Sequence, residues 1–388
     1  MSRPPAHRGR PVRPQDVLFQ VALLAAVVAV IAGMAWNASH ALERQNIASG
    51  FGFLDNTAGF DIVQTLVAYD ETSTYGRVLL VGILNTLLVA VIGVVLATLL
   101  GLVIGIGQLS SNWLFARLCR AYVEILRNIP LLLQLFFWYF AVLRALPGPR
   151  ESWSLLGSAF LNNRGLYLPK PLTGPGFEVV VLALGVGLIA AAILAHVRRR
   201  QREERGRVGP VLVPVLGLSL LPPLAALGAM QFPVSFSWPE LAGFDFEGGF
   251  TVLPELIALV VALSTYTASY IAEIVRAGIQ GVPKGQIEAS QALGLKRGEA
   301  LRLVIIPQAL RQIIPPLTSQ YLNLTKNSSL AVAIAYPDLV SVFAGTTLNQ
   351  TGQAIEIIAI TMAVYLTFSL LTSAAMNAYN RRIALTER

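Results

Sequence analysis

The chain has 388 residues, of which 55% are hydrophobic and 13% are charged, about half the charged share of an ordinary soluble domain. The mean hydropathy of +0.63 argues against a soluble enzyme, because so apolar a chain would expose too much apolar surface to water. The net charge is +8, but the basic residues follow a membrane topology, so no nucleic-acid partner is expected. One cysteine, Cys119, and three scattered histidines give no metal-ligand cluster, so no metal site is expected.

Eight stretches are long and apolar enough to form transmembrane helices, which need about 20 residues each. The predicted spans are residues 17–36, 80–106, 121–143, 178–196, 209–230, 253–275, 312–335 and 356–378. The seventh is the weakest because it contains Pro315, Pro316 and Lys326. Such residues indicate that neighbouring helices or a wet path satisfy the freed backbone groups. The predicted fold class is an all-α polytopic membrane protein.

The basic residues predict how these spans are oriented. With the N-terminus in the cytoplasm, the cytoplasmic segments carry 21 Lys and Arg, and six lie in or beside the external loops. This bias matches the positive-inside rule and predicts cytoplasmic N- and C-termini. The first span could be a signal peptide, but its apolar run exceeds the usual core of about 7–15 residues, which favours an uncleaved anchor. The basic run at 198–202 is interpreted as a topological determinant, with a lipid head-group site as the alternative.

The cytoplasmic loop from Gly281 to Pro307 carries the most informative motif. Pro283 suits the first turn of a helix, and Gly294 suits the left-handed residue that ends one. Between them the small residues Ala289, Ser290 and Ala292 would let another protein approach closely. A second short helix is expected from about Lys296, and Pro307 introduces the next span. A capped helix in a long loop is typical of a docking element, with a plain connector as the alternative.

This loop resembles the coupling loop of the inner-membrane subunits of ABC importers. That pattern is Glu-Ala-Ala, three residues, Gly, nine residues and Ile-x-Leu-Pro. Here Glu288-Ala289-Ser290 is followed by Gly294 and then by Val304-Ile305-Ile306-Pro307. The resemblance implies that the loop couples the chain to a separate ATPase through Glu288, Ala289, Ser290, Gly294 and Pro307.

Further stretches resemble the polar-amino-acid branch of these permeases: Asn85 to Leu87, Arg127 to Leu132, Tyr270 to Arg276 and Lys326 to Leu330. The stretch from Gly50 to Asp61 resembles the broad-specificity L-amino-acid permeases of Gram-negative bacteria. The resemblance implies a permease domain over residues 82–378, with a five-helix core and inserted helices at about 178–230. Residues 1–81 would supply a cytoplasmic N-terminus, the first span and a periplasmic loop, and residues 379–388 a cytoplasmic tail.

Two charged pairs lie at the expected cytoplasmic edge of the core. Glu124 with Arg127, and Glu273 with Arg276, each place an acid and a base three residues apart on one helix face. Each pair is interpreted either as an internal partnership that makes a charged helix end tolerable or as a gate that rearranges during transport.

Lys326 lies about 20 Å into the seventh predicted span, where an ammonium costs several kcal/mol unless it is paired or wet. One interpretation pairs Lys326 with Glu255 or Glu356. The other places Lys326, with Asn327 and Ser328, along the substrate path, where it would meet a substrate carboxylate. Three further residues, Thr265, Ser269 and Gln134, are weaker candidates for that path.

The resemblance implies an amino-acid permease subunit in a bacterial inner membrane. No Gly-x-x-x-x-Gly-Lys-Ser/Thr motif occurs, so we expect no cofactor on this chain, and ATP and Mg would be used by the partner ATPase. The implied partners are an ATP-binding subunit dimer, a second permease subunit, a periplasmic amino-acid-binding protein and membrane lipid. The alternative is an ion-coupled secondary transporter. Such proteins usually carry carboxylates or broken helices at mid-membrane, whereas the acids here lie near span ends.

Overall fold

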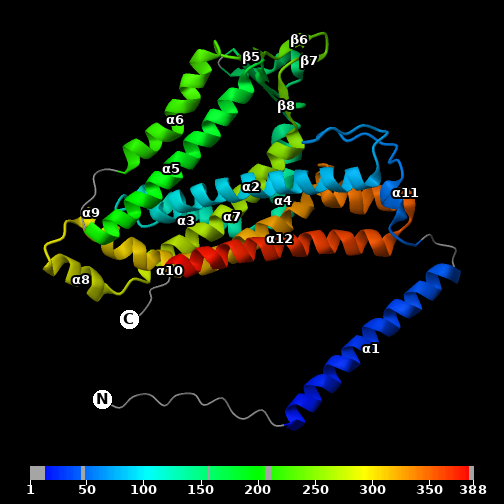
Figure 1. Ribbon diagram of the computed structural model, residues 1–388, viewed down its shortest axis with the longest axis horizontal. Helices are drawn as coiled ribbons and strands as arrows, with labels where there is room; N and C mark the ends of the chain where they lie inside the picture. Colours follow the sequence, from blue (N-terminus) through cyan, green and yellow to red (C-terminus); the bar gives the residue numbers. More distant parts are fainter. Residues whose placement is uncertain (1–13, 45–48, 156, 206–210, 384–388) are drawn as a thin grey trace. The chain divides into compact units, whose positions relative to one another are not determined.

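A computed structural model describes residues 14–44, 49–155, 157–205 and 211–383 of the chain (Figure 1). The chain forms two compact units, one from residues 1–127 with 267–388 and one from residues 128–266. The start of the expected cytoplasmic N-terminus, 1–13, and the end of the expected tail, 384–388, lie outside the described residues.

The first unit is helical throughout its regular structure. Helix α10 contacts both α2 and α12 (Figure 1). Segments of tighter or wider helix occur at Gly52–Asp55, Leu301–Ile305, Ser328–Ile334 and Val340–Thr347. The α-helices are α1 (Pro14–Arg44), α2 (Tyr75–Gly107), α3 (Trp113–Asn128), the second half of α7 (Pro254–Gln280), α8 (Lys284–Ala292), α9 (Arg297–Ala300), α10 (Ile306–Asn327), α11 (Leu348–Thr351) and α12 (Ala354–Ile383).

Helix α2 is packed through its small residues. It starts behind Thr74, whose Oγ1 accepts a hydrogen bond from the N–H of Arg77 at 3.4 Å, as an N-cap does. A Cβ added to Gly101 would lie 2.6 Å from Cβ of Ile271, and one added to Gly105 would lie 2.7 Å from the carbonyl oxygen of Ala272. Glycine therefore lets α2 approach α7 more closely than any larger residue would allow.

The start of α2 is embedded in an apolar core cluster. Tyr75 and Phe343 both lie with their ring centroids 6.2 Å from that of Phe53. Ile357, in the first turn of α12, belongs to the same cluster and is fully buried. The cluster therefore holds the beginnings of α2 and α12 beside each other.

The second unit combines helices with short strands. The helices are α4 (Leu131–Phe136), which continues as a π-helical segment to Leu143, α5 (Phe177–Arg205), α6 (Leu212–Ala229) and the first half of α7. Helices α5 and α6 pack side by side (Figure 1). The strands are β1 (Trp153–Leu155), β2 (Ala159–Asn162), β3 (Gly165–Leu168), β4 (Lys170–Thr173), β5 (Val234–Ser237), β6 (Glu240–Ala242), β7 (Asp245–Glu247) and β8 (Phe250–Val252).

These strands correct the all-α prediction. They form an antiparallel sheet in the order β1-β2-β3-β8 and two separate hairpins, β4 with β5 and β6 with β7. Each strand has only three or four residues, too few for a clear alternating pattern. The turn residues gave a usable signal: Asn163 and Arg164 join β2 to β3, and Gly243, at φ +66°, lies in the β6–β7 turn. We refer to these strands as the β module.

The eight predicted spans are supported only in part. By length and composition, five helices of the described chain could each cross a membrane: Tyr75–Gly107, Phe177–Arg198, Leu212–Ala229, Pro254–Gln280 and Ala354–Arg381. The third predicted span is broken at Ile129 and Pro130 between α3 and α4, and it makes a sixth if the bent pair is one span. The first is a shorter apolar helix, Leu18–Met34. The seventh, α10, is not among these helices.

Candidate functional site

The predicted docking helix is present as α8. It begins directly after Pro283 and ends before Gly294, whose φ of +74° is left-handed. The N–H of Gly294 donates to the carbonyl of Gln291 at 2.9 Å, and the N–H of Leu295 donates to that of Ser290 at 3.2 Å. This is the double hydrogen bond of a Schellman ending. The predicted helix and its glycine end are confirmed.

The outer face of α8 differs in one residue from the prediction. Glu288, Ala289 and Ala292 are exposed, but Ser290 is buried and its Oγ donates to the carbonyl of Ile287 at 2.7 Å. The prediction that Ser290 lies on the approachable face is wrong for this subunit, because its hydroxyl satisfies the helix backbone instead. Leu293, which was not predicted as a contact residue, is 80% exposed at the end of α8. In the sequence, a leucine directly before a helix-ending glycine in a cytoplasmic loop could have indicated this exposed contact residue.

Hydrogen bonds tie this loop to α10. Nε2 of Gln308 donates to Oε1 of Gln286 at 3.2 Å, and Nε2 of Gln312 donates to the carbonyl of Gly281 at 3.3 Å. Pro307 lies in the first turn of α10, where proline costs no hydrogen bond. A displacement of α8 can therefore be transmitted to α10 in two ways: through these two hydrogen bonds, and along the helical segments that run from α9 into α10.

The two charged pairs meet at the contact of α3 with α7. The guanidinium of Arg276 pairs with Glu273, with Nε 3.0 Å from Oε2, and its Nη1 donates to Gln280 at 2.7 Å. Cζ of Arg127 lies 5.0 Å from the ring centroid of Tyr270, within the range of a cation–π contact. Glu124 is exposed on α3. The Glu273–Arg276 pair is thus formed, and its role as a gate stays a prediction.

The predicted span 312–335 is not one continuous α-helix, and Lys326 lies near the end of its helical part. Helix α10 ends at Asn327, and the chain continues as a 3-10 segment to Ala335, where φ is +58°. Lys326 is exposed in the last turn of α10, where a cation is favoured by the helix dipole. Within the described chain Lys326 makes no ion pair. Of the two acids proposed for it, Glu356 accepts the N–H of Gly50 at 2.6 Å and Glu255 accepts the hydroxyl of Tyr139 at 2.7 Å.

Four of the five remaining substrate-path candidates donate to nearby backbone carbonyls or are buried. Oγ1 of Thr265 donates to Val261, Oγ of Ser328 donates to Thr325, both at 2.7 Å, and Nε2 of Gln134 donates to Ile129 at 2.9 Å. Ser269 is fully buried in α7. Of the six candidates, Lys326 is exposed, and Thr265 and Asn327 are partly exposed.

Sequence reasoning missed a buried polar cluster, which we call the polar clamp: Asn85, Thr86 and Asp338. Nδ2 of Asn85 donates to the carbonyls of Gln64 at 2.9 Å and Pro337 at 2.8 Å, and Oγ1 of Thr86 accepts the N–H of Leu339 at 3.1 Å. Oδ1 of Asp338 accepts the N–H of Ser341 at 2.8 Å, and burial raises the pKa of Asp338 to about 7. In the sequence, adjacent Asn and Thr residues in an otherwise apolar helix could have indicated this buried polar cluster.

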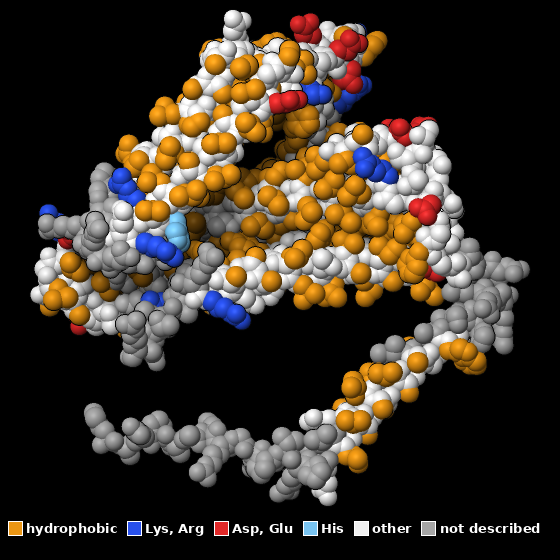
Figure 2. Space-filling model, viewed as in Figure 1, with side chains coloured by type: hydrophobic (Ala, Val, Ile, Leu, Met, Phe, Trp, Pro, Cys, Tyr) orange, Lys and Arg blue, Asp and Glu red, His pale blue; other side chains and the backbone are white. Residues whose placement is uncertain are grey.

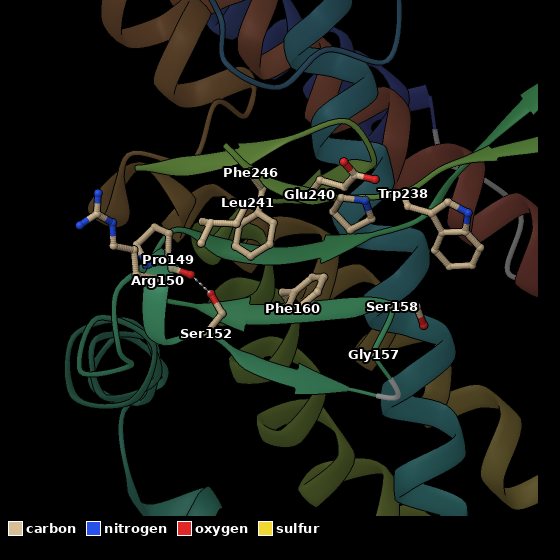
Figure 3. A pocket seen from close by; sticks show the side chains of 11 residues that line it. Pro149, Arg150, Ser152, Gly157, Ser158, Phe160, Trp238, Glu240, Leu241 and Phe246 are labelled. Carbon is tan, nitrogen blue, oxygen red and sulfur yellow. Dashed lines mark hydrogen bonds between the residues drawn. The ribbon is translucent and has the colours of Figure 1, made fainter. Parts of the chain in front are cut away.

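The β module contains a pocket of about 440 Å³ (Figure 3). Phe160 and Phe246 line it with ring centroids 4.8 Å apart, and Figure 3 shows Arg150 directed away from Phe160. Outside the pocket lining, Asp245 accepts from Tyr167 at 2.8 Å and from Arg164 at 2.7 Å. Although burial opposes it, these hydrogen bonds lower the pKa of Asp245. The aromatic wall suits an apolar side chain of a protein partner better than a free ion.

Comparison with known proteins covers nearly the whole chain. It is 54% identical to a putative amino-acid ABC transporter permease protein, YhdX, of Escherichia coli, over 96% of this chain and 94% of that protein. It is 52% identical to the general L-amino acid transport system permease protein AapQ of Rhizobium johnstonii, over 96% and 93%. It is 42% identical to the glutamate/glutamine/aspartate/asparagine transport system permease protein BztB of Rhodobacter capsulatus, over 96% of this chain and 95% of that protein.

The family model for the inner membrane component of binding-protein-dependent transport systems matches residues 97–385. The matched segment contains α8, the Glu273–Arg276 pair and Lys326, together with the whole second unit and the parts of the first unit from residue 97 onward. The resemblance inferred from the Glu288-to-Pro307 motif is therefore confirmed, and the chain belongs to the family of inner membrane components of binding-protein-dependent transport systems.

Proposed function

We propose that this chain is the permease subunit of an ATP-driven importer that moves L-amino acids from the periplasm into the cytoplasm. The observation that carries the proposal is the alignment of 96% of the chain, at 54% and 52% identity, with two proteins named as amino-acid permeases. The chain is a transport subunit rather than an enzyme. The family does not favour the alternative of an ion-coupled secondary transporter.

In this proposal α8 docks on a separate ATP-binding subunit, which binds ATP and Mg. Glu288, Ala289 and Leu293 provide the exposed contact surface, and the left-handed Gly294 fixes the end of the helix. Closure of an ATPase dimer would displace α8. The links of Gln308 and Gln312, beside Pro307, would pass that displacement to α10.

The proposed topology has eight spans with both termini in the cytoplasm of the bacterial inner membrane. It is supported by the 21 basic residues of the cytoplasmic segments against six near the external loops. In this topology the β module is periplasmic, and its aromatic pocket offers a surface to a periplasmic amino-acid-binding protein. A second permease subunit would complete the path. A thiol reagent that cannot cross the membrane should label cysteines at Thr57 and Ser152 but not at Gln201 in intact cells. Labelling at Gln201 would refute the eight-span topology.

The transport activity is tested in proteoliposomes that contain the chain with its co-purified partners. Uptake of radiolabelled L-amino acids should require ATP inside the compartment that holds the ATPase, and the amino-acid-binding protein on the other side. Ionophores that collapse proton and sodium gradients should leave uptake unchanged. Uptake that follows an ion gradient without ATP would refute the importer and favour the secondary transporter.

Lys326 is the proposed contact for the substrate carboxylate, because it is exposed and makes no ion pair within the described residues. Lys326→Met keeps most of the side-chain length and removes the charge. We expect normal assembly with the ATPase and reduced uptake of every amino acid tested. Unchanged uptake would remove Lys326 from the path. Loss of assembly that is rescued by also neutralising an acid would assign Lys326 a structural role.

A further inference from the structure

An apolar groove follows the surface of the first unit between α2 and α12. Its volume is about 340 Å³, and its floor is formed by Tyr321 and Thr325 of α10. The hydroxyl groups of the floor are already used: Tyr321 is hydrogen-bonded to Thr98 at 2.9 Å, and Thr325 donates to the carbonyl of Tyr321 at 2.9 Å. Because these hydroxyl groups already have partners, the groove suits an apolar occupant. Its walls include Leu87, Val91 and Val95 of α2 and Phe368, Leu371 and Ala375 of α12.

Helix α1 is apolar, and its described residues are exposed to the surroundings. Its described side chains are exposed, among them Leu18 at 75% and Met34 at 69%, and Figure 2 shows apolar side chains along it. Ala22, Ala26, Ala29 and Gly33 recur at intervals of four, three and four residues, so they share one face of the helix. Small residues on one face allow close helix packing in a membrane.

The chain that leaves α1 is anchored where α2 and α12 begin. The N–H of Gly50 donates to Oε1 of Glu356 in the first turn of α12 at 2.6 Å, and Phe53 packs against Tyr75, the first residue of α2. Gly50 lies six positions after Arg44, the end of α1, which limits their separation to about 20 Å. Helix α1 therefore ends within about 20 Å of Gly50, and in the eight-span topology proposed above, on which this inference rests, it runs antiparallel to α2 and α12.

The depths of the groove and of the small-residue face agree. Val91 of α2 and Leu371 of α12 lie about 25 Å from the first residues of their helices, at 1.5 Å per residue. The same depth measured back from Arg44 falls between Ala26 and Ala29, in the middle of the small-residue face. We propose that α1 packs into the groove between α2 and α12 of its own chain, with Ala22, Ala26, Ala29 and Gly33 toward the groove.

Disulfide crosslinking in native membranes tests this packing. In a background with Cys119→Ser, Ala29→Cys is combined with Val91→Cys or with Leu371→Cys, and the membranes are oxidised. We expect a crosslink within one chain, seen as an altered mobility of the monomer. The matched control is Val28→Cys, one residue away on another face of α1, for which the crosslink should be lost.

Two crosslinking results would overturn the proposal. A crosslink between chains, detected by mixing copies with different tags, would place α1 on another copy. Equal or absent crosslinking for Ala29→Cys and Val28→Cys would leave α1 facing lipid. A second variant pair guards against misfolding of the cysteine variants: Ala29→Phe should lower the melting temperature of the detergent-solubilised complex, whereas Val28→Phe should not. Equal shifts for the two Phe variants would also contradict the packing.

Discussion

Helices α2 and α6 are both long and apolar enough to cross a membrane, yet they are used differently. In the apolar stretch of α2, 28% of the residues are buried inside the protein, whereas in α6 only Pro223 is buried. Helix α2 carries glycines in contact with α7 and the Asn85 and Thr86 of the polar clamp. The one polar side chain of α6, Ser219, donates only to its own helix at Val215.

Apolar content therefore tells where a helix enters the membrane, and small or polar residues on one face tell what it packs against. This difference implies that substitutions at the packed glycines of α2 should be costly, whereas those at exposed positions of the α5–α6 hairpin, such as Gly185, should be nearly neutral. The expected effects below run from the largest to the smallest.

The most damaging change should be Gly105→Val. Its side chain would meet the backbone of Ala272 and the side chain of Val275, both closer than 3 Å to the new Cβ. Overpacking of this kind costs about 3 kcal/mol at its upper end, so the melting temperature of the solubilised complex should fall sharply. Gly185→Val in α5 is the control, because no atom lies within 4 Å of its Cβ position. Similar losses in both variants would remove the contrast between the two regions.

A smaller loss is expected from Asn85→Leu, which leaves the carbonyls of Gln64 and Pro337 without their donor. An unsatisfied buried polar group costs about 1–3 kcal/mol. Ser219→Ala in α6 removes a hydrogen bond within one helix and should change stability little. Denaturation in mild detergent measures both. A neutral Asn85→Leu would show that the polar clamp does not hold α2.

The polar clamp should also make stability depend on pH. The pKa of Asp338 is raised from 3.8 in the unfolded chain to about 7 in the folded protein, so the folded state binds more protons between these values. The contribution of Asp338 to the free energy of unfolding therefore decreases as pH rises from about 4 to about 7, and it does not change further at higher pH. We expect about 1 kcal/mol less stability at pH 8 than at pH 6. Asp338→Asn should abolish this dependence; an unchanged profile would assign it to other groups.

The mildest structural effect is expected at the exposed coupling loop. Gly294 has a left-handed φ of +74° but no atom within 4 Å of its Cβ position, so Gly294→Val strains only its own backbone, by about 1 kcal/mol. The subunit should insert normally, while less ATPase co-purifies with it. Gly294→Asn, which tolerates this conformation, should restore binding. Full ATPase recovery with Gly294→Val would show that the end of α8 does not govern docking.

The same contrast explains which features the sequence could predict. The ends of α8 follow from Pro283 and Gly294, because local backbone preferences decide them. The Glu273–Arg276 pair follows from its spacing on one helix. The polar clamp was missed because its partners, Asn85 and Pro337, are distant in sequence and meet only after folding. The end of α10 at Asn327 was missed for the same reason, since the chain beyond the following 3-10 segment is held at Leu339 by Thr86 of α2.

The β4–β5 ladder sets how the α5–α6 hairpin is joined to the rest of the chain. Entry at Thr173 and exit at Val234 are paired strand residues, and the N–H of Gly174 donates to the carbonyl of Pro233 at 2.9 Å. The segment between Thr173 and Val234, which contains α5 and α6, therefore begins and ends at neighbouring points of the same two-stranded ladder. A short turn could therefore replace it without rerouting either flank. We expect that the α5–α6 hairpin can be gained, lost or exchanged in a single insertion or deletion, because the strands that flank it would keep their positions.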